Sequence, residues 1–177
     1  MTEFFVDITV DNNGTVQIEI PFDAAKSVAG DISNEPSLPS HEITFTAPAP
    51  TLIITRAAGQ SESTITLPIN FTVTFSEDVT GFDASGITIG GTAAGTATAT
   101  VTGAGTTYNV AIAGVTANGT INITVKGNAA ENSFGTFNAL TGPGPNVTYW
   151  GIAPIPTITY VGADPTSASP INFTVTF

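Results

Sequence analysis

Hydrophobic and polar residues alternate most regularly in an eight-residue segment that occurs twice in the chain. The segment Pro-Ile-Asn-Phe-Thr-Val-Thr-Phe occupies residues 68–75 and again residues 170–177. The apolar positions of the first copy are Ile69, Phe71, Val73 and Phe75. This period of two places one set of side chains on a single face of a sheet. Each copy is therefore predicted to be a β-strand with one buried face, and the exact repetition indicates a tandem array.

Two further alternating patterns each surround an Asn-Gly dipeptide. Residues 4–10 and 16–20 flank Asn13-Gly14, and residues 108–112 and 121–125 flank Asn118-Gly119. Asn-Gly favours the positive φ angles that a tight hairpin turn requires. Each pattern is therefore predicted to form a β-hairpin, and the second is a copy of the first.

Irregular connectors, short closing strands and proline-containing linkers follow both patterns. The connectors are residues 23–40 and 128–145, the closing strands 42–45 and 146–149, and the linkers 47–51 and 153–157. Alternating prolines keep a linker extended and remove hydrogen-bond donors. We predict three segments: the C-terminal part of one repeat (1–50), a complete repeat (51–152) and the opening strands of a next repeat (153–177).

The complete repeat contains about seven strand candidates, including 65–75, 85–89 and 96–102, with turn signals every 8 to 12 residues. This spacing is typical of an antiparallel sandwich. The predicted fold class is all-β, with antiparallel Ig-like β-sandwich repeats of which one is complete and two are partial.

The amino-acid composition and the net charge exclude several classes of function. Only 10% of residues are charged, the formal net charge is −11, and there is no cysteine. Three cations cannot replace the counterions of a phosphate backbone, which excludes nucleic acid as a partner. No segment reaches the roughly 20 apolar residues of a membrane span, and the N-terminus lacks the pattern of a secretory signal. We expect export information to lie outside this chain, because both ends fall inside repeats.

The run 68–87, followed by Gly103-Ala104-Gly105-Thr106-Thr107-Tyr108-Asn109-Val110, resembles the bacterial Ig-like repeats of large microbial surface proteins. The resemblance covers the middle repeat fully and the flanking segments in part. It implies an Ig-like sandwich, an extracellular or cell-surface location, and a stalk or adhesive role. The family has no catalytic residues to transfer to this chain.

Candidate chemistry is sparse. His41 is the only histidine, so a Ser-His-Asp arrangement would depend on it alone. Acidic residues after a strand, Glu77, Asp78 and Asp83, would suit paired-carboxylate glycosidase chemistry, but solvated turn residues explain them better. No enzymatic activity is predicted. The cofactor prediction is none, with calcium as the possible exception, held by loop carboxylates among Glu77, Asp78, Asp83 and Asp164.

Asn-x-Thr sequences and the single tryptophan give further candidates. Asn70, Asn122 and Asn172 occupy outward strand positions, so glycosylation there would not disturb a core. Trp150 follows a closing strand. It is interpreted as a plug between adjoining domains, with stacking on a sugar ring as the other possibility.

The predicted function is a non-catalytic structural repeat of a microbial surface protein, serving as stalk, spacer or filament subunit. The alternative is an adhesin module that binds a glycan or a partner protein. The expected partners are neighbouring repeats, copies of the chain itself, and possible surface glycans. Head-to-tail strand exchange would use the C-terminal strand through Ile171, Phe173, Val175 and Phe177. The combined partial repeats lack a counterpart of residues 76–105, so either the completed domain is reduced or the chain is part of a longer array.

Overall fold

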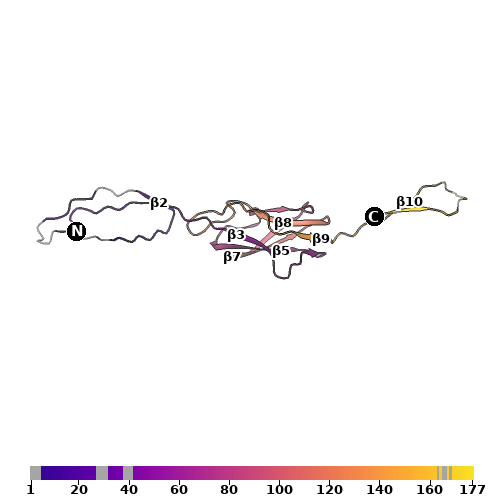
Figure 1. Ribbon diagram of the computed structural model, residues 1–177, viewed down its shortest axis with the longest axis horizontal. Helices are drawn as coiled ribbons and strands as arrows, with labels where there is room; N and C mark the ends of the chain where they lie inside the picture. The colour runs from indigo at the N-terminus through magenta and orange to yellow at the C-terminus, as the bar shows by residue number, and fades with distance from the viewer. Residues whose placement is uncertain (1–4, 27–31, 38–41, 163, 165–166, 168) are drawn as a thin grey trace.

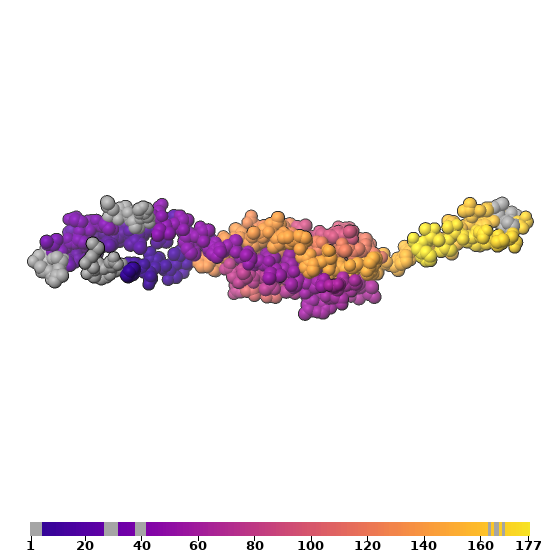
Figure 2. Space-filling model, in the orientation of Figure 1, coloured from indigo at the N-terminus to yellow at the C-terminus, as the bar shows by residue number. Residues whose placement is uncertain are grey.

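The computed structural model describes residues 5–26, 32–37, 42–162, 164, 167 and 169–177. Phe4 of the predicted first hairpin and His41 lie outside these described residues. A β-sandwich occupies the middle of the molecule, and the N-terminal segment and a C-terminal hairpin extend from its opposite ends (Figures 1 and 2). The protein is therefore elongated, with three parts in a line.

Two sheets form the sandwich, which confirms the predicted all-β class. One sheet has the order β3-β5-β7, from Leu52–Arg56, Ile69–Val79 and Thr98–Ala113. The other has the order β4-β9-β8-β6, from Ser63–Thr64, Val147–Tyr149, Gly119–Val125 and Ile87–Gly90, with a 3-10 turn, η1 (Ala84–Gly86), before β6. All pairs are antiparallel except β4 with β9.

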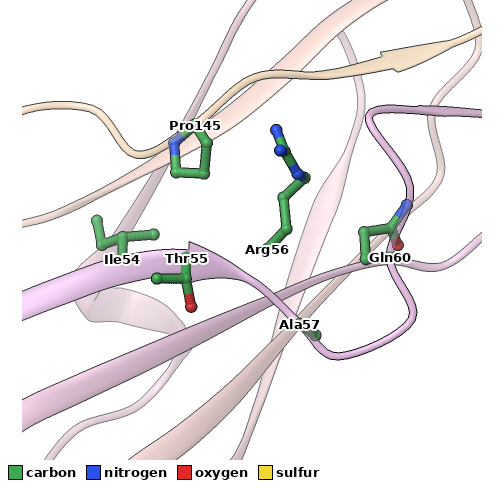
Figure 3. Close-up of a pocket in the computed structure, with 6 residues that line it drawn as sticks. All are labelled: Ile54, Thr55, Arg56, Ala57, Gln60 and Pro145. Carbon is green, nitrogen blue, oxygen red and sulfur yellow. The ribbon is translucent and has the colours of Figure 1, made fainter.

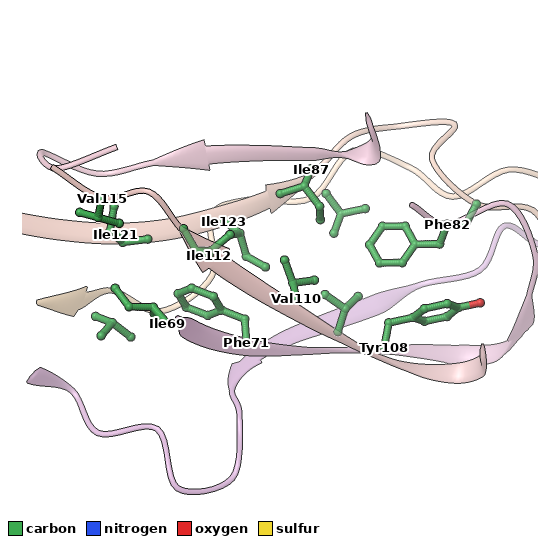
Figure 4. Close-up of a cluster of buried hydrophobic side chains, with 14 of the residues drawn as sticks. Ile69, Phe71, Phe82, Ile87, Tyr108, Val110, Ile112, Val115, Ile121 and Ile123 are labelled. Atoms are coloured by element: carbon green, nitrogen blue, oxygen red, sulfur yellow. The ribbon is translucent and has the colours of Figure 1, made fainter. Parts of the chain in front are cut away.

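The core lies between the two sheets (Figure 4). Ile69, Phe71 and Val73 of β5 are 0% exposed, and Phe75 is 3% exposed. The second sheet contributes the fully buried side chains of Ile121, Ile123, Val125 and Val147. The alternation along the first octapeptide therefore predicted the buried face of β5 correctly.

Both predicted hairpins are wrong. In the sandwich, β7 pairs with β5 in one sheet, whereas β8 pairs with β6 and β9 in the other. The chain around Asn118 therefore crosses between sheets, because the apolar faces of β7 and β8 must meet across the core and cannot do so as neighbours in one sheet. In the N-terminal segment, β1 (Gly14–Val16) pairs with β2 (Ile43–Phe45), and residues 5–10 form no strand.

Strand β7 also differs from the prediction, because residues 96–102 and 108–112 were expected to be separate strands. The structure has one 16-residue strand that continues through Gly103 and Gly105, whose φ angles are 125° and 65°. The pairing register with β5 shifts between Thr74 and Val79. Glycine tolerates these positive φ values, so the irregularity is absorbed within the strand without ending it.

The pairing of the N-terminal strands matches the last strands of the sandwich residue for residue. Gly14 pairs with Phe45 as Gly119 pairs with Tyr149, and Val16 pairs with Ile43 as Ile121 pairs with Val147. The same tripeptide, Asn-Gly-Thr, begins at positions 13 and 118. The N-terminal pair is therefore a structural counterpart of β8 and β9.

The C-terminal hairpin matches the first strands of the sandwich. β10 (Thr157–Tyr160) and β11 (Phe173–Thr176) pair so that Val175 faces Ile158, as Val73 faces Ile54. Ile54 lies four residues after Pro50, the second proline of its linker, whereas Ile158 lies two residues after Pro156. A shift by two keeps every side chain on the same face of the sheet. The hairpin is therefore a counterpart of β3 and β5.

A buried asparagine organises the connector after β8. Asn138 is 2% exposed. Its Oδ1 accepts from the N–H groups of Ala129 (2.9 Å) and Ala130 (2.8 Å), and its Nδ2 donates to the carbonyls of Lys126 and Ala139 at 2.8 Å each. Four backbone groups of an irregular segment are thereby satisfied by one side chain.

The N-terminal connector has a counterpart of this network. Asn34 Oδ1 accepts from Ala25 N–H at 2.8 Å, and its Nδ2 donates to Pro21 O at 2.9 Å and to Glu35 O at 2.8 Å. A non-glycine residue with positive φ begins both connectors, Asp23 at 64° and Asn128 at 59°. In their described residues the two connectors therefore share a positive-φ start and an asparagine that binds several backbone groups.

Candidate functional site

The best-defined contact between parts of the molecule joins the N-terminal segment to the loop after β8. We call it the junction, and it consists of Asn13, Phe45, Ala47 and Pro48 on one side and Asn132, Phe134 and Thr136 on the other. Asn13 Oδ1 accepts from Ala47 N–H at 2.7 Å, while its Nδ2 donates to Phe134 O (3.0 Å) and to Thr136 Oγ1 (2.9 Å). One side chain thus holds its own segment and the next one together.

Asn132 forms the buried part of the junction, at 4% exposure. Its Oδ1 accepts from the N–H groups of Phe134 (3.1 Å) and Thr136 (3.0 Å), which shapes the loop. Its Nδ2 donates to Pro48 O at 3.2 Å and to Glu77 Oε1 at 3.3 Å. The linker, the loop and strand β5 therefore meet at one amide.

Apolar contact and a hydroxyl complete the junction. The rings of Phe45 and Phe134 lie 5.8 Å apart between centroids, and Ala47 is 3% exposed. Thr136 Oγ1 also contacts Ala47 O at 3.3 Å. Neither Asn132 nor Thr136 belongs to an alternating pattern or a known motif, so neither could be identified from the sequence.

The four predicted calcium ligands lie apart or are already engaged. Glu77 accepts from Asn132, and Asp83 caps η1 by accepting from Ser85 N–H (2.8 Å) and Ser85 Oγ (2.6 Å). These two bonds from Ser85 hold the pKa of Asp83 below its ordinary value. Asp164 lies in the connection between β10 and β11. Within the described ranges, no three His, Asp or Glu side chains are grouped to hold a metal.

Asp78, the remaining predicted ligand, lies near the aromatic end of the core. Tyr108 donates its hydroxyl to Val79 O at 3.0 Å and packs edge-on against Phe75 and Phe82 at 5.9 and 5.1 Å. Burial, followed by the negative charge of Asp78, raises the pKa of Tyr108. The phenol of Tyr108 beside Asp78 therefore stays neutral. A cation site that includes Asp78 remains a prediction.

The C-terminal strand predicted for assembly is paired within its own chain but covered on neither face. Ile171, Phe173, Val175 and Phe177 are 53%, 61%, 50% and 82% exposed. Their counterparts in the first octapeptide are 0 to 3% exposed. The backbone of β11 thus has one partner strand, β10, while its apolar face is open to solvent.

The predicted glycosylation sites differ in accessibility. Asn70 is partly buried, and its Nδ2 donates to Pro68 O at 3.2 Å. Asn122 is also partly buried, and its Nδ2 donates to Asn146 Oδ1 at 2.8 Å. Asn172 is exposed. Modification of the first two would disturb an existing hydrogen bond, so Asn172 is the most accessible of the three.

A shallow groove of about 550 Å³ runs beside the edge strand β3 (Figure 3). It is lined by Ile54, Thr55, Arg56, Ala57, Gln60 and Pro145. Arg56 forms an ion pair with Glu62 at 2.7 Å and contacts Asn146 O. The lining contains no aromatic ring on which a sugar could stack, which gives the glycan-binding alternative no support at this groove.

Trp150 is 59% exposed and directly follows β9, on the segment that leads from the sandwich to the C-terminal hairpin. Asn118 binds both backbone groups of Ile152, an arrangement we call the clamp: its Oδ1 accepts from Ile152 N–H at 2.9 Å and its Nδ2 donates to Ile152 O at 2.7 Å. The position predicted for a plug between domains is therefore at an end of the sandwich and accessible.

In the part of the chain that the structure describes, no helix is long and apolar enough to cross a membrane. Comparisons with family models, curated proteins and solved structures find no significant match. The resemblance to bacterial Ig-like repeats therefore rests on the residues quoted for it.

Proposed function

We propose that this chain is a non-catalytic segment of a microbial surface protein built from tandem Ig-like β-sandwich repeats, acting as a stalk, spacer or filament subunit outside the cell. The observation that carries the proposal is the match of strand pairing at both ends. The N-terminal segment repeats the pairing of β8 with β9, and the C-terminal hairpin repeats that of β3 with β5. A counterpart of the last strands placed before the sandwich, and a counterpart of the first strands placed after it, are the order expected of tandem repeats.

The topology of the sandwich supports the Ig-like assignment. A sheet of β3, β5 and β7 faces a sheet in which β8 lies between β6 and β9, like the three-stranded C, F and G arrangement of Ig domains. The linear order of the three parts supports a spacer role (Figure 1). The junction supports it too, since hydrogen bonds and an aromatic contact hold adjoining parts in a fixed relation.

Head-to-tail joining by strand exchange is the filament form of the proposal. The C-terminal hairpin of one molecule supplies counterparts of β3 and β5, and the N-terminal segment of the next supplies counterparts of β8 and β9. Covering the face of β11 would bury four apolar side chains that are now half or more exposed, worth about 4–7 kcal/mol before ordering costs. The completed domain would lack counterparts of β6 and of the first half of β7, residues 98–105, and residues 5–10, which correspond in sequence to the second half of β7, form no strand.

Light scattering after size-exclusion chromatography tests this form on the full chain. Val175→Asp places a charge on the apolar face of β11, and Thr174→Asp places the same charge on the opposite face. For the unchanged chain and for Thr174→Asp, the molar mass should rise with protein concentration. For Val175→Asp, it should stay at the value of the monomer. A monomeric unchanged chain at all concentrations would rule out strand exchange.

The spacer form is tested separately by small-angle scattering from the monomer. An extended particle with the sandwich between two slender ends is the expected result. A compact particle, in which the terminal segments pack on one another or on the sandwich faces, would contradict a stalk or spacer.

A further inference from the structure

The end of the sandwich around Asn118 repeats the half of the junction that the N-terminal segment provides. From this we infer that Asn118, Trp150 and Ile152 form a docking surface for a following β-sandwich unit, and that its occupant is the loop of that unit corresponding to residues 132–136. The inference rests on the proposed function and deepens it, because it names the contact that would fix successive units in the array.

The two asparagines hold the chain in the same way. Asn13 Oδ1 accepts from the N–H group of Ala47 (2.7 Å), and Asn118 Oδ1 accepts from that of Ile152 (2.9 Å). In both cases the donor follows its asparagine by 34 residues. Each asparagine precedes the strand counterpart that begins with Gly-Thr. Ile152 is therefore the structural counterpart of Ala47.

The amide NH₂ groups of these asparagines have different partners. That of Asn13 reaches across the junction to Phe134 O and Thr136 Oγ1, whereas that of Asn118 donates to Ile152 O within its own clamp. Docking of a loop would exchange one acceptor for another, so hydrogen bonds are not lost and the net cost is small. Asn118 is exposed, which leaves its amide within reach of an incoming loop.

The residue held by the clamp, Ile152, and the residue two positions before it, Trp150, are both apolar. Trp150 and Ile152 are 59% and 40% exposed, whereas Ala47, the counterpart of Ile152, is 3% exposed beneath the docked loop. A large aromatic and an aliphatic residue beside a satisfied amide are the composition of an interface centre. The surface around Asn118 therefore presents more apolar area than the matching half of the existing junction.

The linker length agrees with this larger surface. Pro50 is three positions after Ala47, and Pro156 is four positions after Ile152. One additional residue lengthens an extended linker by up to about 3.5 Å. The greater separation makes room for Trp150 and Ile152 where the first junction has Thr46 and Ala47.

An extended chain tests the inference with all the natural segments in place. Residues 51–156 are repeated once after Pro156, so that the first Trp150 faces a complete second unit. Trp150→Phe in the second copy leaves one tryptophan as reporter. Relative to the original chain, its emission should shift to shorter wavelength and its quenching by acrylamide should fall at least about twofold, as expected for a half-exposed ring covered by a packed interface.

Thr136→Val in the second copy removes the hydroxyl of the docking loop with little change of shape. In the junction that the structure describes, this hydroxyl contacts only groups of the N-terminal side, Asn13 and Ala47 O. The variant should restore part of the quenching of Trp150. The matched control, Thr136→Val in the first copy, acts at the other junction and should leave Trp150 protected.

Three results would overturn the inference. If both sandwiches fold and Trp150 stays as exposed as in the original chain, the docking surface is refuted and the array proposal stands. If Trp150 is protected but the two Thr136→Val variants behave alike, the loop is not the occupant. If the second sandwich does not fold, the array proposal fails together with the inference.

Discussion

Asn138 is predicted to be the most sensitive polar residue of the sandwich. Asn138→Ala removes four hydrogen bonds and leaves the N–H group of Ala130, a residue only 1% exposed, without an acceptor. A net loss of about 1 kcal/mol for each bond gives about 4 kcal/mol for the four, and the unsatisfied buried N–H group adds at least about 1 kcal/mol, so the expected destabilisation is about 5 kcal/mol. This is a large share of the stability of a domain of about 100 residues.

Urea unfolding followed by circular dichroism measures this loss, with the free energy obtained by linear extrapolation. Asn34→Ala is the matched control, since Asn34 forms the equivalent bonds in the N-terminal connector and contributes nothing to the sandwich core. It should leave the main transition unchanged. A loss below about 1 kcal/mol for Asn138→Ala would show that water replaces the amide, and would refute the reasoning from burial.

The two octapeptide copies supply a second comparison: Phe71→Ala should destabilise the sandwich by about 3–5 kcal/mol, while Phe173→Ala should leave its unfolding transition unchanged, because only Phe71 is buried. Asp83 has a lowered pKa, so its ionised form favours the folded state; stability should fall as the pH drops below about 4, and Asp83→Asn should weaken this dependence in acid titrations. Calorimetric titration with calcium tests the predicted cation site. A titration without heat, together with an unchanged melting temperature, would refute the site.

The buried face of β5 could be predicted because its signal is local. Period-two alternation needs no knowledge of the rest of the chain, and the residues it selected, from Ile69 to Phe75, are nearly inaccessible to solvent. The closing strands 42–45 and 146–149 were found in the same way and correspond to β2 and β9. The linkers were predicted from their prolines, because proline restricts the backbone wherever it occurs.

Strand partners could not be predicted in the same way. Asn13-Gly14 and Asn118-Gly119 have the composition of hairpin turns, yet the strand after each pairs with a closing strand far along the chain. Pairing is decided by which apolar faces must meet across the core, and this information is distributed over the whole repeat. Asn138 and Asn132 were missed since a single buried amide in an irregular loop leaves no periodic trace. Alignment of the two connectors with a one-residue gap would have revealed Asn138, because Asn34 lies 11 residues after Asp23 and Asn138 lies 10 residues after Asn128.

The two identical octapeptides differ in burial, so comparing them shows which properties of the strand depend on its own sequence and which depend on the residues packed against it. Val73 and Val175 face equivalent neighbours, Ile54 and Ile158, so the sequence determines the backbone pairing in both copies. Only Val73 lies beneath a second sheet, and only Val73 is buried.

Any segment that covers β11 must therefore present a period-two apolar face in the position of β8. Within the described chain, β1 has the pairing of β8, and the apolar residues that continue from it, Ile18 and Ile20, are 39% and 52% exposed. The N-terminal segment of a second copy therefore meets this requirement, and the acidic character of the chain makes salt favour the encounter by screening the repulsion between copies.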